Sequence, residues 1–176
     1  QILLSTATVV LVGVVGRQMF GRTAGRVGAL LLACHPGLII YASTKVHALT
    51  AEAFLFFLAI WQIYQMREDR AMRRAVWTGL VLGVSILSRA TAVVFLPVGL
   101  VWLLMIRPRP ERLMEFKRWV LMVACAGAVI TPWLVRGVVV HHRFVFIRTS
   151  SWEMFWRGNT PQATGGSQID ATHTIY

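Results

Sequence analysis

Residues 76–106 read VWTGLVLGVSILSRATAVVFLPVGLVWLLMI, a long apolar stretch interrupted by the polar turn Ser88–Thr91. One continuous helix, rising about 1.5 Å per residue, would be far longer than a ~30 Å hydrocarbon core and would place Arg89 in lipid. Each half, however, is shorter than the ~20 residues that a full span usually needs. We therefore predict a helical hairpin whose turn stops below the outer membrane surface. Such a turn is tolerated only inside protein or beside water, so Arg89 should mark a recess that opens outward.

The composition extends this interpretation to the whole chain. Of its 176 residues, 56% are hydrophobic and only 14% are charged, whereas an ordinary soluble domain has about 25% charged residues. This composition excludes a water-soluble globular domain and an intrinsically disordered chain. The apolar runs cover residues 2–16, 27–41, 53–64, 76–87, 92–106 and 119–140. We predict an all-α fold, a polytopic transmembrane helical bundle of about six spans.

The net charge of +11 has a topological explanation. Arg and Lys gather in three clusters, and cytoplasmic loops of membrane proteins accumulate these residues, so nucleic-acid binding is not expected. The clusters comprise Arg17, Arg22 and Arg26; Arg67, Arg70, Arg73 and Arg74; and Arg107, Arg109, Arg112, Lys117 and Arg118. If all three face the cytoplasm, an even number of spans separates them. The sequence then predicts a multi-pass protein of the inner (plasma) membrane, with short outward-facing hairpins at 27–64 and 76–106.

The composition changes after the last apolar run. Pro132 lies near the outer end of this run, where it should kink or end the helix. Residues 141–176 mix aromatic, polar and basic side chains and predict an extracytoplasmic segment near the membrane interface. We thus predict a transmembrane region at 1–140 and an extracytoplasmic segment at 141–176. Because Gln1 already lies in an apolar run, we expect an internal fragment of a larger membrane domain, inactive by itself.

Arg89 and Arg136 are the main candidates for binding an anion. Each ends an apolar helix, and a charge within a membrane costs about 2.5–3.5 kcal/mol on insertion scales, so a functional role is the default expectation. The alternative is that each side chain reaches lipid headgroups. Arginine binds phosphate through two parallel hydrogen bonds and stays charged, so these residues predict a phosphate site, with Lys45 as a weaker third member.

The remaining titratable residues give less specific signals. Glu52 follows Thr50 at the start of a predicted helix, where an acid is favoured by the helix dipole. It could instead orient a cation such as Lys45, or a sugar hydroxyl. No histidine or cysteine has partners at metal-ligand spacing, so we predict no metal site from the residues alone.

Four stretches together resemble the bacterial GT-C membrane glycosyltransferases related to protein O-mannosyltransferases and the lipid A aminoarabinose transferase. They are Gly16–Arg22 (GRQMFGR); Pro36–Tyr41 with Ala51–Phe54; Gly79–Pro97, which contains Leu87–Thr91; and Pro132–Arg136 with Gly158–Pro161 and Gly165. Each motif is short, but their order and spacing follow the family's pattern over nearly the whole chain.

The resemblance implies an inverting transfer of a sugar from a polyprenyl-phosphate donor to a lipid, glycan or protein acceptor. It places the catalytic acidic base in a loop that would precede Gln1. Arg89, Arg136 and Lys45 would bind the donor phosphate, and the motifs add Glu52, Tyr41 and Asn159 as supporting residues. No cofactor is implied with certainty, and dependence on a divalent metal stays open.

Two other functions remain compatible with the same residues. A transporter of an anionic or lipid-linked solute could use the recess, although proton coupling usually needs acids within the spans. A non-catalytic scaffold of the cell envelope could use its outer cations only to bind lipid headgroups.

Overall fold

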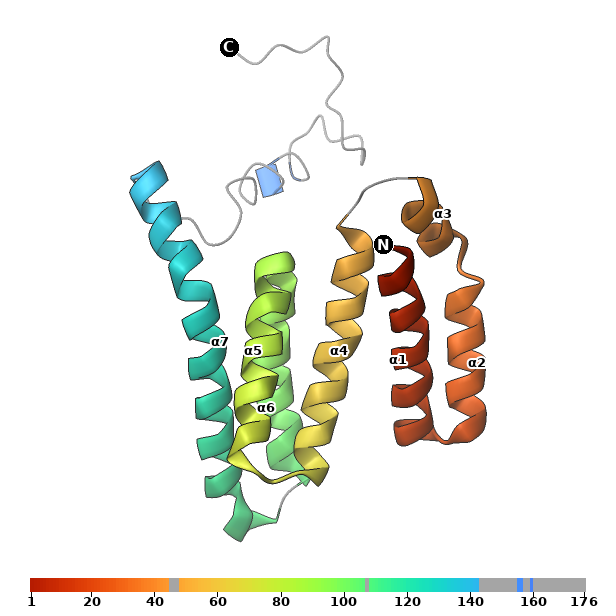
Figure 1. Cartoon of the computed structure of the whole chain (residues 1–176). Helices are drawn as coiled ribbons and strands as arrows, with labels where there is room; N and C mark the ends of the chain where they lie inside the picture. Colours follow the sequence, from red (N-terminus) through yellow and green to blue (C-terminus); the bar gives the residue numbers. More distant parts are fainter. Residues whose placement is uncertain (45–47, 107, 143–154, 157–158, 160–176) are drawn as a thin grey trace. The chain divides into compact units, whose positions relative to one another are not determined.

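The computed structural model describes residues 1–44, 48–106, 108–142, 155, 156 and 159. Nearly all of them are helical and none forms a strand, which confirms the all-α prediction for this part of the chain (Figure 1). The helices are α1 (Ile2–Phe20), α2 (Arg22–Ala33), α3 (Pro36–Thr44), α4 (Leu49–Glu68), α5 (Met72–Ser88), α6 (Phe95–Ile106) and α7 (Arg112–His141). Two 3₁₀ turns, η1 (Ala90–Val94) and η2 (Arg109–Glu111), precede α6 and α7.

Three segments are long and apolar enough to cross a membrane: Ile2–Phe20, Leu49–Glu68 and Arg109–Val140. They contain the predicted runs 2–16, 53–64 and 119–140. The other predicted runs form helices of 9 to 17 residues, shorter than the ~20 that a full span usually needs. The three segments support an integral membrane protein, and the number of six spans stays a prediction.

The hairpin predicted at residues 76–106 is present. Helix α5 ends at Ser88, and Arg89 takes an extended conformation (φ −144°, ψ 112°) before η1 turns the chain into α6. The returning arm packs within the bundle, since the Trp119 side-chain N–H donates to the Leu96 carbonyl at 3.0 Å. The polar residues that interrupt the apolar stretch therefore form the turn, as predicted.

The run 27–41 does not form one continuous helix as its apolar pattern suggested. Helix α2 ends at Ala33 and α3 begins at Pro36, because proline has no backbone N–H and fits the first turn of a helix. His35 joins the two helices. Its backbone N–H donates to the Leu32 carbonyl at 3.2 Å, and its Nδ1 accepts the Leu38 backbone N–H at 3.3 Å. This side chain thus satisfies a free donor at the start of α3.

Two compact units divide the chain, Gln1–Pro132 and Trp133–Tyr176. Their boundary lies inside α7, which continues through Pro132 to His141. Of the two expected effects of this proline, an end of the helix does not occur, and a kink stays a prediction. The predicted boundary between a transmembrane region at 1–140 and an extracytoplasmic segment at 141–176 describes position in the membrane and not a compact unit. It stays a prediction.

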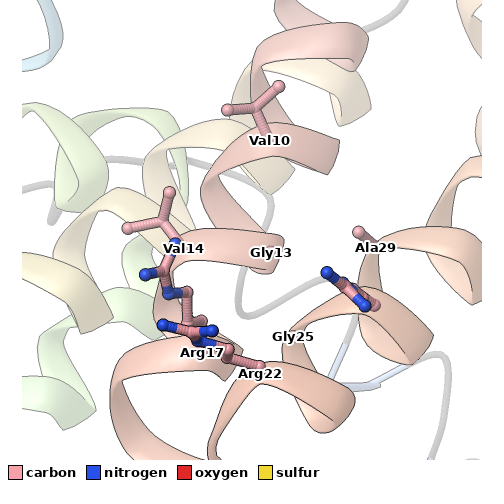
Figure 2. A pocket seen from close by; sticks show the side chains of 8 residues that line it. Val10, Gly13, Val14, Arg17, Arg22, Gly25 and Ala29 are labelled. Atoms are coloured by element: carbon pink, nitrogen blue, oxygen red, sulfur yellow. The ribbon is translucent and has the colours of Figure 1, made fainter.

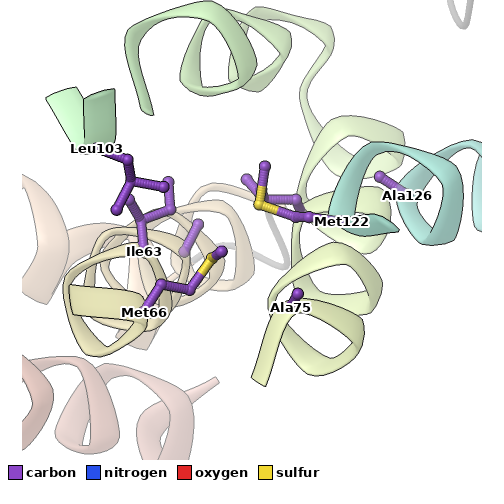
Figure 3. Close-up of a cluster of buried hydrophobic side chains, with 8 residues drawn as sticks. Ile63, Met66, Ala75, Leu103, Met122 and Ala126 are labelled. Carbon is purple, nitrogen blue, oxygen red and sulfur yellow. The ribbon is translucent and has the colours of Figure 1, made fainter. Parts of the chain in front are cut away.

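Within the first unit, α4, α5, α6 and α7 share one apolar core. Figure 3 shows side chains of these helices meeting in it. The buried members are Ala59, Ile63, Met66, Ala75, Leu82, Leu103, Met122 and Ala126. Two glycines let α5 approach α7 closely, because an added Cβ would collide with the Met122 carbonyl at Gly79 and would lie 2.7 Å from the Val129 Cβ at Gly83. This small-xxx-small pair is typical of membrane helix packing.

A buried ion pair joins α7 to the end of α4. Arg118 is fully buried and donates from Nη1 to both carboxylate oxygens of Glu115, at 2.9 and 2.8 Å. Its Nη2 donates to the carbonyls of Met66 and Asp69, at 3.1 and 2.6 Å. Those carbonyls lie at the C-terminal end of α4, where they lack helical partners. Arg118, predicted only as a marker of the cytoplasmic side, is thus a structural cap.

Candidate functional site

The candidate site lies where the start of α4 meets the end of α5. Glu52 is in the first turn of α4, and Arg89 directly follows α5. The two helices are held together near this end, because the Ser85 hydroxyl donates to the Leu55 carbonyl at 3.3 Å as well as to its own helix. This packing brings together two charged residues that are far apart in the sequence.

Arg89 and Glu52 form an ion pair. Nη1 of Arg89 donates to Oε2 of Glu52 at 2.8 Å, a length typical of a charge-assisted hydrogen bond. The Glu52 side chain is 10% exposed, whereas that of Arg89 is 58% exposed. The acid is therefore held inside, and the guanidinium faces the opening. A guanidinium has five N–H donors, and this contact uses one of them, so others can bind a second acceptor.

The pair lies on the wall of a cavity of about 390 Å³. Much of the rest of the wall is apolar and includes Phe56 from α4 and Phe95 from α6, whose ring centroids are 5.2 Å apart. Ser85 and Thr91 add hydroxyl groups. The cavity can thus hold a ligand that is apolar over much of its surface and carries a charged or hydroxylated group near Arg89.

Glu52 lies in the first turn of α4, as expected of an acid favoured by the helix dipole. It also pairs with Arg89, a partner that was not predicted, while its predicted contacts to a sugar hydroxyl or to Lys45 stay predictions. Lys45 lies outside the described residues. Tyr41 belongs to α3, but its side chain is likewise outside the described part.

Arg136 and Asn159 belong to the second unit. The Arg136 guanidinium stacks on the Trp133 ring, with its carbon 5.1 Å from the ring centroid. Asn159 donates from Nδ2 to the Phe155 carbonyl at 2.7 Å and is exposed. Within the first unit, the structure brings together the predicted site residues Arg89 and Glu52.

The aromatic and hydroxyl residues of the cavity wall were not predicted. Apolar residues within a span carry the same sequence signal whether they face lipid, core or a cavity. One usable signal was helical spacing. Phe56 follows Glu52 by four residues, so the two lie on the same face of α4, and Ser85 lies in the last turn of α5, just before Arg89.

A metal site finds no support in the described residues. Across the ranges 1–44, 48–106 and 108–142, no three His, Cys, Asp or Glu side chains come together in a way that could hold a metal ion.

Comparison with known protein families identifies a matching family. Residues 1–135 match the family model described as dolichyl-phosphate-mannose-protein mannosyltransferase. The matched range contains α1 to α6, most of α7, and both Glu52 and Arg89. No curated protein and no solved structure matches the chain.

Proposed function

We propose that this chain, which belongs to the dolichyl-phosphate-mannose-protein mannosyltransferase family, transfers a sugar from a polyprenyl-phosphate donor to an extracytoplasmic acceptor with inversion. The family is of the GT-C type, so the chain is part of an integral membrane glycosyltransferase, in agreement with its three span-length apolar segments. The choice of donor, the stereochemistry and the nature of the acceptor belong to the proposal.

The ion pair at the mouth of a largely apolar cavity is the observation that carries this proposal. A polyprenyl phosphate combines an isoprenoid chain with one anionic group, and the cavity combines the Phe56 and Phe95 rings with an exposed guanidinium. Glu52 holds Arg89 in place through one donor and leaves others for phosphate oxygens. We therefore assign Arg89 to the donor phosphate and Glu52 to the positioning of Arg89.

The reaction follows from the chemistry of this donor. An acceptor hydroxyl or amine attacks the anomeric carbon while a carboxylate base takes its proton. The bond from the anomeric carbon to the phosphate oxygen breaks, and the polyprenyl phosphate leaves with the bonding electrons. Arg89 stabilises the negative charge that grows on the leaving phosphate, and a fixed donor does this without reorganisation. Because Glu52 is engaged with Arg89, it is not assigned as the base.

The proposal includes residues and topology that depend on the sequence alone. Arg136 and Lys45 would also contact the donor phosphate, and Tyr41 and Asn159 would support the site. Residues 1–140 would form the transmembrane region in the inner membrane, with residues 141–176 on the extracytoplasmic side. The acceptor would be a lipid, a glycan or a protein.

A transfer assay on the intact purified protein tests the proposal. The donor is a polyprenyl phosphate with a radiolabelled sugar, and the readouts are labelled product and released polyprenyl phosphate. Transfer should require Arg89 but not Arg73, an exposed arginine in the first turn of α5. Uptake of an anionic solute into proteoliposomes, with no labelled product from any acceptor fraction, would overturn the proposal in favour of a transporter.

A further inference from the structure

A second cavity lies at the closed end of the hairpin formed by α1 and α2. It has a volume of about 550 Å³, and Arg17, Arg22 and Arg26 contribute to its wall. Figure 2 shows Arg17 and Arg22 at this closed end, close to Gly25, with Val14 and Val10 further along α1. Gly25 allows the two helices to approach, because a Cβ there would lie 2.7 Å from the Arg17 backbone nitrogen.

The three arginines of this cavity lack acidic neighbours. The first Asp or Glu in the sequence is Glu52, and no ion pair of these arginines occurs within residues 1–44, 48–106 and 108–142. Other basic residues pair with acidic side chains of the chain, as in the partly exposed Arg70–Glu111 pair at 3.0 Å and the buried Arg118–Glu115 pair at 2.8 Å. Three guanidinium groups around one cavity repel one another, and a bound anion would offset that repulsion.

The rest of the cavity wall indicates what kind of anion fits. Val10 and Val14 line it on α1, about two turns and one turn before Arg17, and they are 61% and 37% exposed. The cavity is therefore positively charged at the closed end of the hairpin and apolar along the helix. A small inorganic anion would use only the charged end. An anionic phospholipid carries a phosphate next to acyl chains. Its phosphate would match the charged end of the cavity, and an acyl chain would match the apolar wall along α1.

This cavity is distinct from the candidate site at Arg89. Gln18 lies beside the second half of α4, because its Oε1 accepts the Trp61 side-chain N–H at 3.1 Å and its carbonyl accepts the Tyr64 hydroxyl at 3.2 Å. Glu52 lies three turns before Tyr64, roughly 18 Å along the helix axis. The two cavities are therefore near opposite ends of the first unit, and the second does not depend on the proposed transfer reaction.

We propose that the α1–α2 hairpin binds an anionic phospholipid, with its phosphate among Arg17, Arg22 and Arg26 and an acyl chain along Val14 and Val10. The guanidinium groups donate to the phosphate oxygens, and arginine suits this contact because its planar donors match a phosphate. This role differs from the predicted one, in which the cluster only marks the cytoplasmic side.

Lipid binding by the intact purified protein tests this proposal. Delipidated protein in detergent is titrated with dioctanoyl phosphatidylglycerol, dioctanoyl phosphatidylcholine or inorganic phosphate, and bound ligand is counted by native mass spectrometry. Phosphatidylglycerol should bind more tightly than either of the others. In the triple variant Arg17→Gln, Arg22→Gln, Arg26→Gln, its dissociation constant should rise at least about tenfold, as expected for loss of charge-assisted hydrogen bonds.

A matched control separates a defined site from general electrostatic attraction. The triple variant Arg73→Gln, Arg109→Gln, Lys117→Gln removes the same charge from exposed residues, and its dissociation constant should stay within about threefold of the unchanged protein. Equal weakening in both triple variants would overturn the proposal. So would equally tight binding of inorganic phosphate, which indicates a small-anion site, or of phosphatidylcholine, which indicates an uncharged groove. If the triple glutamine variant fails to fold, the triple variant Arg17→Lys, Arg22→Lys, Arg26→Lys serves in its place. It retains the charge and should bind phosphatidylglycerol more weakly than the unchanged protein.

Discussion

The Nη1 atom of Arg89 lies 2.8 Å from Oε2 of Glu52, so the residue that turns the α5–α6 hairpin holds an acid from the first turn of α4. This contact fixes a cation at the mouth of the cavity before any ligand arrives. A phosphate that binds there meets a guanidinium already oriented by the protein. The most direct predictions therefore concern these two residues.

Replacing Arg89 should abolish transfer without preventing membrane insertion. Arg89→Ala removes the proposed contact to the leaving phosphate and should lower kcat/KM by about 10²-fold or more, the usual effect of losing a transition-state donor. Arg89→Lys should also be impaired, because a single ammonium does not reproduce the planar donors of arginine. The measurement is transfer from a radiolabelled polyprenyl-phosphate sugar. Unchanged kinetics in both variants would remove Arg89 from the site.

Replacing Glu52 should act through the orientation of Arg89. Glu52→Gln keeps an oxygen that accepts a hydrogen bond but loses the charge, so its kcat/KM should fall by less than that of Glu52→Ala. A misplaced catalytic group can cost about 10²-fold, and the alanine variant should approach that loss. The same steady-state assay checks this order. If Glu52 were the base that deprotonates the acceptor, glutamine would be as inactive as alanine, and the positioning role would be wrong.

Replacing Arg118 should destabilise the bundle rather than alter its chemistry. Arg118→Met leaves Glu115 buried beside an apolar side chain and frees the carbonyls of Met66 and Asp69. Removing one partner of a buried pair typically costs about 3–5 kcal/mol. The free energy of unfolding in detergent, measured with a reversible denaturant, should fall by that order. Because Arg73 lies in the first turn of α5 and is exposed, Arg73→Met serves as the control and should change it by less than about 1 kcal/mol.

The packing of α5 on α7 can be tested with two glycines. At Gly79 a Cβ would collide with the Met122 carbonyl, whereas at Gly127 it would meet no atom within 4 Å. Gly79→Ala should therefore lower the free energy of unfolding by about 1–3 kcal/mol through overpacking. Gly127→Ala should leave it unchanged or raise it by up to about 1 kcal/mol, since alanine favours a helix. Equal effects in both variants would contradict the close approach.

The stability of the α4–α5 turn should depend on pH. A hydrogen bond from the Ala71 backbone N–H to Asp69, at 2.9 Å, lowers the pKa of that carboxyl below its ordinary value, and the charges of Arg74 and Arg73 lower it further. A carboxyl whose pKa is lower in the folded than in the unfolded protein stabilises the fold at neutral pH. This contribution is lost as the pH falls from the pKa of unfolded Asp69 to below its pKa in the folded protein. The denaturant concentration at the midpoint of unfolding should therefore fall less on acidification in the Asp69→Asn variant than in the unchanged protein.

Much of the fold was predictable from the sequence, because span length, basic clusters and helix breakers are local signals. The turn at Arg89 followed from the length of its apolar stretch and from the charged residue that one continuous helix would place in lipid. The break at His35 was missed, since the run around it is as apolar as a continuous helix. The partner of Glu52 was missed for another reason. An ion pair between residues of different helices depends on how those helices pack against each other. Residue spacing in one sequence predicts contacts within a helix but not which residues of two helices lie side by side.

Helices α4 and α5 contact each other on both sides of their middle, through Glu52–Arg89 and Leu55–Ser85 toward one end and Gln62–Arg74 toward the other. The Arg118 cap on α4 and the Gly79 approach to α7 both lie toward the end of the bundle away from Arg89. Helices tied in this way tilt little against one another. A bulky isoprenoid tail should therefore enter beside Arg89 through rotation of the exposed Phe56 side chain rather than through separation of α4 from α5.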